Sequence, residues 1–128
     1  MAQVIHWQAR VFRIKYIQEQ YDRGREAART DAENGIRKVY IQLVGGWGQF
    51  LFELLRDRYG IFAQHVSDIT TVEKLSYEAG YNSIAHEYIE TTHGEGTMQH
   101  IDEEVHAFRA KQYRKYLRAC LQDMRRQE

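Results

Sequence analysis

The chain has 128 residues, of which 43% are hydrophobic and 28% charged, values typical of a single globular domain covering residues 1–128. Its 18 basic and 18 acidic side chains balance, which argues against binding to nucleic acid or to an anionic membrane through net charge. No apolar run is long enough to span a membrane, and the single cysteine, Cys120, has no partner for an internal disulfide. We therefore expect a cytoplasmic protein.

The first 34 residues predict one long amphipathic helix. Residues 3–34 contain one glycine and no proline, and hydrophobic side chains recur there at spacings of three and four residues. The alternative is a strand over residues 10–17, because Phe12, Ile14 and Tyr16 alternate with basic residues. Gly35 suits the position after a helix, where glycine readily adopts the left-handed conformation.

Residues 37–66 have the pattern of a βαβ unit. Residues 38–44 alternate between an apolar and a mixed face, which predicts a strand, and the glycine-rich residues 45–48 predict a tight loop. A helical apolar face follows over residues 49–59, and residues 61–66 alternate again. Because a helix separates the two strands, we expect them to be parallel.

Two further helices complete the chain. Thr70 and Glu73 match a capping box, so the third helix should begin there and end near His93. The last helix should begin near Met98, with acidic residues first and basic residues later, as the helix dipole favours. The sequence predicts a helix-rich α/β domain of order α-β-α-β-α-α, in which long helices cover a short parallel βαβ unit.

Two helices each carry a glycine in similar surroundings. Gly24 follows Tyr21 by three residues, and Gly80 follows Tyr77 by three. A glycine in the middle of a helix costs about 1 kcal/mol relative to alanine. Close approach of another backbone would explain both glycines, so we expect the two helices to cross at Gly24 and Gly80.

The glycine-rich segment is the first candidate site. It consists of Gly45, Gly46, Trp47 and Gly48. Free amides at the start of a helix can hold a phosphate or carboxylate, and Trp47 could stack on a ring. The segment matches neither standard nucleotide-binding motif, and a simple turn with Trp47 over the core is the competing interpretation.

The second candidate is a metal site between residues 86 and 106. This span holds four of the six histidines and contains two Glu-x-x-His pairs, a pattern found in carboxylate-bridged metal proteins. The candidate ligands are His86, Glu90, His93, Glu103 and His106. A divalent metal is the one cofactor that the sequence suggests, and a solvated acidic face is the competing interpretation.

The third candidate is a subunit interface on the third helix. That helix carries two apolar stripes, and a sheet face can receive only one of them. We expect the other stripe to pair two subunits: Tyr77, Tyr81, Ile84 and Tyr88. Free edges of a two-stranded sheet also favour a homodimer.

Three functions are compatible with these patterns. A non-enzymatic interaction or regulatory module that works as a homodimer is favoured, because no specific catalytic motif is present. The alternatives are a small-molecule or phosphate binder or enzyme that uses residues 45–48, and a metalloprotein that uses the span from residue 86 to residue 106.

Overall fold

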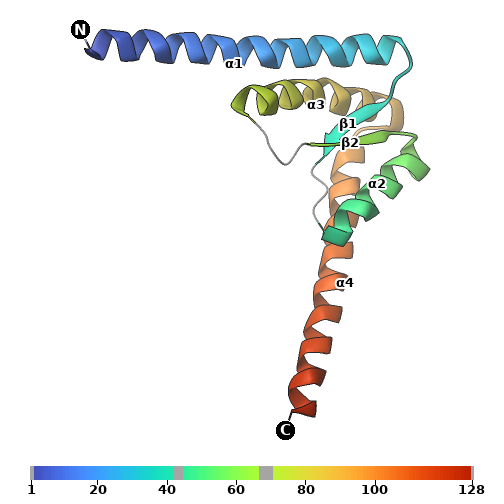
Figure 1. Cartoon of the computed structure of the whole chain (residues 1–128). Coiled ribbons are helices and arrows are strands. Elements are labelled where there is room, and N and C mark those ends of the chain that lie inside the picture. The colour runs from blue at the N-terminus through green and yellow to red at the C-terminus, as the bar shows by residue number, and fades with distance from the viewer. Residues whose placement is uncertain (1, 42–44, 67–70, 128) are drawn as a thin grey trace.

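The computed structural model describes residues 2–41, 45–66 and 71–127, and its elements follow the predicted order (Figure 1). They are α1 (Ala2–Glu33), β1 (Lys38–Ile41), α2 (Gly45–Tyr59), β2 (Phe62–His65), α3 (Val72–His93) and α4 (Thr97–Arg126). The helix-rich α/β class is confirmed. The region from residue 10 to residue 17 is helical and belongs to α1, so the alternative of a strand there is wrong.

Within the described residues, β1 and β2 form a two-stranded parallel sheet. Lys38 pairs with Phe62 at one end of the register and Ile41 pairs with His65 at the other. Both strands are shorter than predicted, and residues 42–44 of the predicted first strand lie outside the described part.

The other edge of β1 is covered by α3. The backbone N–H of Tyr40 donates to Oδ1 of Asn82 at 2.8 Å, and Nδ2 of Asn82 donates to the carbonyl oxygen of Tyr40 at 2.8 Å. The Asn82 amide thus satisfies both groups of Tyr40, as a neighbouring strand would. We expected a second subunit to cover free sheet edges, but at Tyr40 the chain covers its own edge.

Helices α1 and α3 lie side by side and run in the same direction (Figure 1). Their backbones touch at the two glycines, as predicted. A Cβ atom added to Gly24 would lie 2.0 Å from the carbonyl oxygen of Tyr77, and one added to Gly80 would lie 2.0 Å from the carbonyl oxygen of Tyr21. Only glycine allows this approach, so the two mid-helix glycines define the contact.

The core lies between the helix pair, the sheet and α2. Its buried hydrophobic residues come from every element: Ala28, Val39, Leu54, Leu55, Ile61, Ala63, Tyr81, Ile84, Ala85, Ile89, Ile101 and Val105. Tyr81 is only 2% exposed, and its hydroxyl donates to the carboxylate of Asp31 at 2.6 Å. This hydrogen bond fixes α3 along α1 and leaves the phenol satisfied.

Two predicted helix starts need correction. The N-cap of α3 is Thr71, whose hydroxyl accepts a hydrogen bond from the backbone N–H of Lys74 at 3.2 Å. Thr70 lies outside the described residues, and a lysine three positions after Thr71 cannot complete a capping box. The second correction concerns α2, which begins at Gly45, so the predicted loop of residues 45–48 is the first turn of that helix.

The first half of α4 packs on the rest of the protein, and the second half extends away from it (Figure 1). Phe108 stacks on Phe50 of α2 with 4.3 Å between ring centroids, and Arg58 pairs with Glu104. No helix in the described part of the chain combines the length and apolar character needed to cross a membrane.

Candidate functional site

The predicted glycine-rich ligand segment lies against α4. Trp47 is half-buried, and the guanidinium of Arg109 lies over its ring, 5.2 Å from the centroid. Gly48 is buried, while Gly45 and Gly46 form the first residues of α2. These residues therefore have helical backbone conformation and do not form the predicted tight loop. A ligand role for these four residues stays a prediction.

Glu90, a predicted metal ligand, caps the start of α4. Its carboxylate accepts hydrogen bonds from the backbone N–H of Gly96 at 2.6 Å and of Met98 at 3.0 Å. The Met98 hydrogen bond is the largest cause of a lowered pKa of Glu90, and burial opposes it. The carboxylate thus occupies the position of a helix-capping anion and stabilises the connection between α3 and α4.

Of the other predicted ligands, only His86 interacts electrostatically with Glu90 among the described residues. His93 meets the ring of Tyr59 edge-on at 5.0 Å, and Glu103 accepts a hydrogen bond from Nε2 of Gln99 at 3.2 Å. On α3, desolvation lowers the pKa of His86, and the carboxylates of Asp102 and Glu90 oppose that shift. His106 is exposed on α4. Within residues 2–41, 45–66 and 71–127, no three His, Cys, Asp or Glu side chains come together to hold a metal ion. The five predicted ligands therefore do not converge in this structure.

The predicted interface stripe lies largely inside the chain. Tyr81 and Ile84 are each 2% exposed, and Tyr77 and Tyr88 are half-buried. Because α1 packs along this face of α3, neither Tyr81 nor Ile84 is available to a second subunit. The other stripe of α3 comprises Val72, Leu75, Ala79 and Ile89. Val72 and Leu75 are 43% and 49% exposed, whereas Ile89 is buried.

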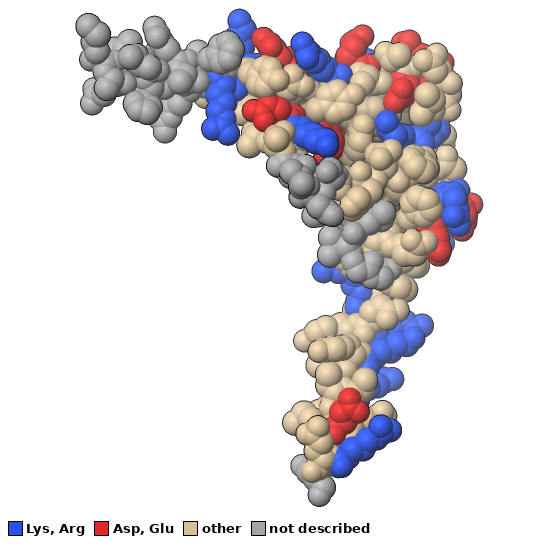
Figure 2. All heavy atoms as spheres, in the orientation of Figure 1, with Lys and Arg blue, Asp and Glu red and all other residues tan. Residues whose placement is uncertain are grey.

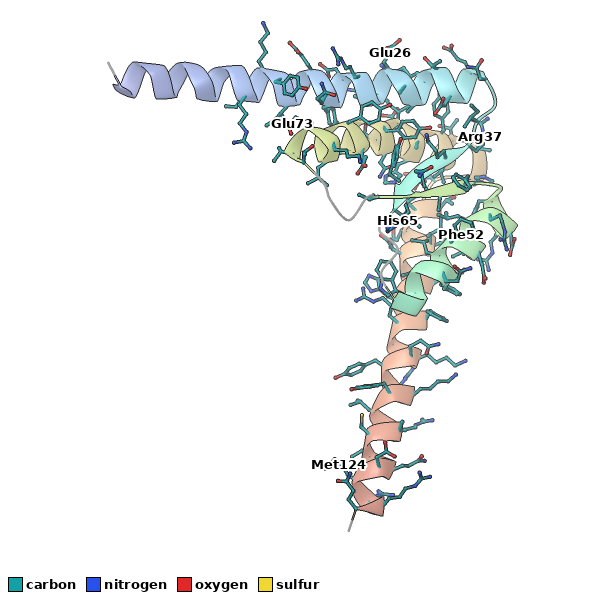
Figure 3. The ribbon with its side chains drawn as sticks, viewed as in Figure 1. Glu26, Arg37, Phe52, His65, Glu73 and Met124 are labelled. Carbon is teal, nitrogen blue, oxygen red and sulfur yellow. The ribbon has the colours of Figure 1, made fainter. Side chains whose placement is uncertain are left out.

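Among the side chains that the structure describes, the largest group of exposed hydrophobic residues lies on the second half of α4. We call it the α4 stripe, and it consists of Tyr113, Tyr116, Leu117, Cys120, Leu121 and Met124. Five of these six side chains are between 42% and 66% exposed, and Cys120 is half-buried. Tyr113 and Tyr116 line a shallow hollow together with Trp47 of α2, and Met124 lies near the end of α4, far from the other described elements (Figure 3). The stripe is thus apolar surface that the described chain leaves uncovered.

Basic side chains occupy the other side of the same segment. Figure 2 shows uncharged residues along one side of the second half of α4 and lysine and arginine along the opposite side. The basic residues of this segment are Lys111, Arg114, Lys115, Arg118, Arg125 and Arg126. Separation of apolar and charged side chains is typical of a helix that packs along one face.

The sequence predicted this helix but did not indicate that its second half is an exposed apolar surface. The available signal was length, because α4 has 30 residues and the neighbouring α2 has 15. At 1.5 Å per residue, the longer helix must extend past its partner. Comparisons with protein-family models, curated proteins and solved structures found no match to this chain.

Proposed function

We propose that this protein is a non-enzymatic interaction module that forms a homodimer by pairing the α4 stripe of two subunits. The observation that carries the proposal is the exposed apolar stripe on a helix that extends beyond the packed core. Contiguous apolar surface of this kind on a folded protein marks an interaction site more often than an isolated exposed side chain does.

The spacing of the stripe suits a helix–helix pair. Tyr113, Leu117, Cys120 and Met124 follow one another at intervals of four, three and four residues. This is the heptad spacing of the seam of a coiled coil, in which each apolar side chain inserts between side chains of the facing helix. Tyr116 and Leu121 flank the seam and would widen it.

The charges favour a second copy of the same helix as the partner. Lys115, Arg118 and Arg125 lie on the side away from the seam, so two stripes can meet without bringing these cations together. The seam itself contains no charged residue. A self-complementary patch on both subunits is what a twofold dimer requires.

Pairing would also explain how the segment stays helical. Ala110 to Arg126 spans 17 residues, or roughly 25 Å. Isolated helices of about this length are marginal in water, and burial of an apolar face supplies most helical stability in proteins. The unpaired thiol of Cys120 on the stripe suits a reducing compartment, and we infer that the module works in the cytoplasm.

Sedimentation velocity over a hundredfold dilution series tests the proposal with two matched variants. Leu117→Glu places a charge in the seam, whereas Gln122→Glu adds the same charge on the opposite side of the helix. We expect the wild type and Gln122→Glu to sediment as dimers at high concentration, and Leu117→Glu to remain monomeric because its new carboxylate would be buried without a partner.

Circular dichroism at the lowest concentration serves as the control for folding of all three proteins. A wild type that remains monomeric throughout the series would refute the dimer. Equal dimerisation of wild type and Leu117→Glu would show that the subunits meet through another surface.

A further inference from the structure

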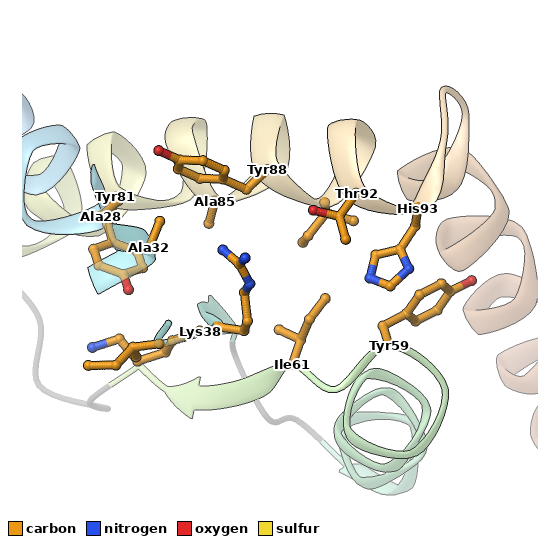
Figure 4. Close-up of a pocket in the computed structure, with 13 residues that line it drawn as sticks. Ala28, Ala32, Lys38, Tyr59, Ile61, Tyr81, Ala85, Tyr88, Thr92 and His93 are labelled. Carbon is orange, nitrogen blue, oxygen red and sulfur yellow. The ribbon is translucent and has the colours of Figure 1, made fainter. Parts of the chain in front are cut away.

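A cavity of about 130 Å³ lies between α1, α3 and the start of the sheet (Figure 4). One part of its wall is formed by alanine and isoleucine side chains. Ala28 and Ala32 come from α1, Ala85 and Ile89 from α3, and Ile61 from the connection before β2. Four of these five residues are at most 8% exposed, so this part of the cavity belongs to the core.

Aromatic rings border the rest of the space. Tyr81 and Tyr88 project from α3, and Tyr59 lies at the far end beside His93 (Figure 4). The rings of Tyr59 and His93 meet edge-on with centroids 5.0 Å apart. Flat rings and small aliphatic groups together suit a planar apolar guest better than a sugar or another polar molecule.

The charged side chains that line the cavity are all basic. None of its 13 lining residues is acidic, although the chain has as many acidic as basic side chains. The ammonium group of Lys38 lies 3.8 Å from the carboxylate of Asp31, which also accepts the Tyr81 hydroxyl. That cation already has an anionic neighbour.

Arg37 differs from Lys38 in this respect. Its guanidinium lies over the ring of Tyr88, 5.8 Å from the centroid. Among the residues that the structure describes, no carboxylate forms an ion pair with it. A guanidinium presents several N–H donors in a plane and binds carboxylates through two parallel hydrogen bonds, so Arg37 is suited to an external anion.

From these observations we propose that the cavity binds a small aromatic monocarboxylate, with its ring among the alanine, isoleucine and tyrosine side chains and its carboxylate on Arg37. The volume fits one ring, because an apolar cavity of about 150 Å³ is known to hold benzene. This site is separate from the α4 stripe and does not depend on dimer formation.

Isothermal titration calorimetry with benzoate as the probe tests the site. Two further probes separate the contributions of ring and charge: benzamide keeps the ring without the charge, and acetate keeps the charge without the ring. We expect benzoate to bind, and we expect both other probes to bind about tenfold or more weakly, because each lacks one of the two interactions.

Arg37→Gln is the principal variant, and Arg29→Gln is its control because Arg29 is exposed on α1 and does not line the cavity. Loss of a charged hydrogen bond should weaken benzoate binding about ten- to a hundredfold in Arg37→Gln. Arg29→Gln should bind benzoate as the wild type does. Ala32→Leu fills the cavity from α1 and should also abolish binding, with circular dichroism to verify that it folds.

Three results would overturn the proposal. Benzoate that gives no binding heat and no thermal shift with the wild type would show that the cavity does not take this class of ligand. Equal affinity of Arg37→Gln and the wild type for benzoate would remove Arg37 from the site. Equal affinity of the wild type for benzamide and benzoate would show that the carboxylate is not recognised.

Discussion

Two regions of the molecule use helical surfaces in opposite ways. One is the contact between α1 and α3, and the other is the second half of α4. In the first region two glycines let the backbones touch, and Tyr81, whose hydroxyl donates to Asp31, is almost fully buried. In the second region large apolar side chains stand on a helix that leaves the core. The difference is that small residues bring α1 and α3 together within the chain, whereas the large apolar residues of the α4 stripe stay exposed on the described structure.

The packed region around α3 and the second half of α4 also differ in their polar contacts. The hydroxyl of Ser76 donates to the carbonyl oxygen of Ile17 at 2.7 Å, and Asn82 holds Tyr40 by two hydrogen bonds. Each of these contacts is directional and fixes the position of α3 along its neighbours. The α4 stripe is mainly apolar, and the polar groups on it are the hydroxyls of Tyr113 and Tyr116 and the thiol of Cys120.

The largest effect should come from breaking the packed contact. Gly24→Ala would place a methyl group 2.0 Å from the backbone carbonyl oxygen of Tyr77, and Gly80→Ala would do the same against Tyr21. The helices must then move apart, which we expect to cost about 3 kcal/mol of unfolding free energy, near the upper end for overpacked cores. This exceeds the gain of about 1 kcal/mol in helix propensity from replacing glycine.

Urea denaturation of the two single variants and the double variant measures this cost. Thr30→Ala, on the exposed side of α1, is a control that changes propensity without touching α3. The two substitutions open the same contact, so the double variant should lose less than the sum of the single losses. Single variants as stable as the wild type would mean that the helices do not touch at these glycines.

An intermediate effect should appear at Glu90, which joins the packed region to the start of α4. Backbone hydrogen bonds from Met98, then Gly96, lower the pKa of this carboxyl in the folded protein. A carboxyl whose pKa is lower folded than unfolded stabilises the protein above its unfolded pKa. That stabilisation is lost as the pH falls through the folded pKa.

Thermal melts of the wild type and Glu90→Gln across a pH series test this sign. We expect Glu90→Gln to melt at a lower temperature at neutral pH, and the difference should shrink as the pH falls through the carboxyl range. Glu87→Gln, on the exposed side of α3, is the matched control. A difference that stays constant in acid would mean that the charge of Glu90 contributes no stability.

The sequence was most informative where one residue type has one physical explanation. A glycine in the middle of each of two helices indicated their contact, because only close approach compensates for its cost. Periodicity gave the order of elements, and the helix between the strands gave their parallel pairing. These features follow from residue types and their spacing along the sequence, so they can be predicted before the tertiary contacts are known.

The features that the sequence did not predict depend on which faces of the helices and strands pack against each other in the folded chain. Tyr81 and Ile84 looked like an exposed stripe because the sequence does not indicate that α1 covers that face of α3. The pairing of Asn82 with Tyr40 joins residues 42 positions apart, and no pattern in the sequence marks it. Thr70 and Thr71 are adjacent and have the same side chain, so the sequence pattern did not show which of the two is the N-cap of α3.

The smallest effect on the core should come from removing the unpacked region. A chain that lacks residues 112–128 keeps the contacts of Phe108 with Phe50 and of Arg109 with Trp47. At low concentration, where both proteins are monomers, we expect the shortened chain and the full chain to melt at the same temperature. At higher concentration only the full chain should gain stability, because dimerisation stabilises the folded state by mass action. The gain is about 2.7 kcal/mol at a hundred times the dissociation constant.

Differential scanning calorimetry over a concentration series measures the melting temperatures of the shortened and the full chain. A shortened chain that melts lower at every concentration would show that the segment supports its own core, and the contrast between the two regions would then disappear.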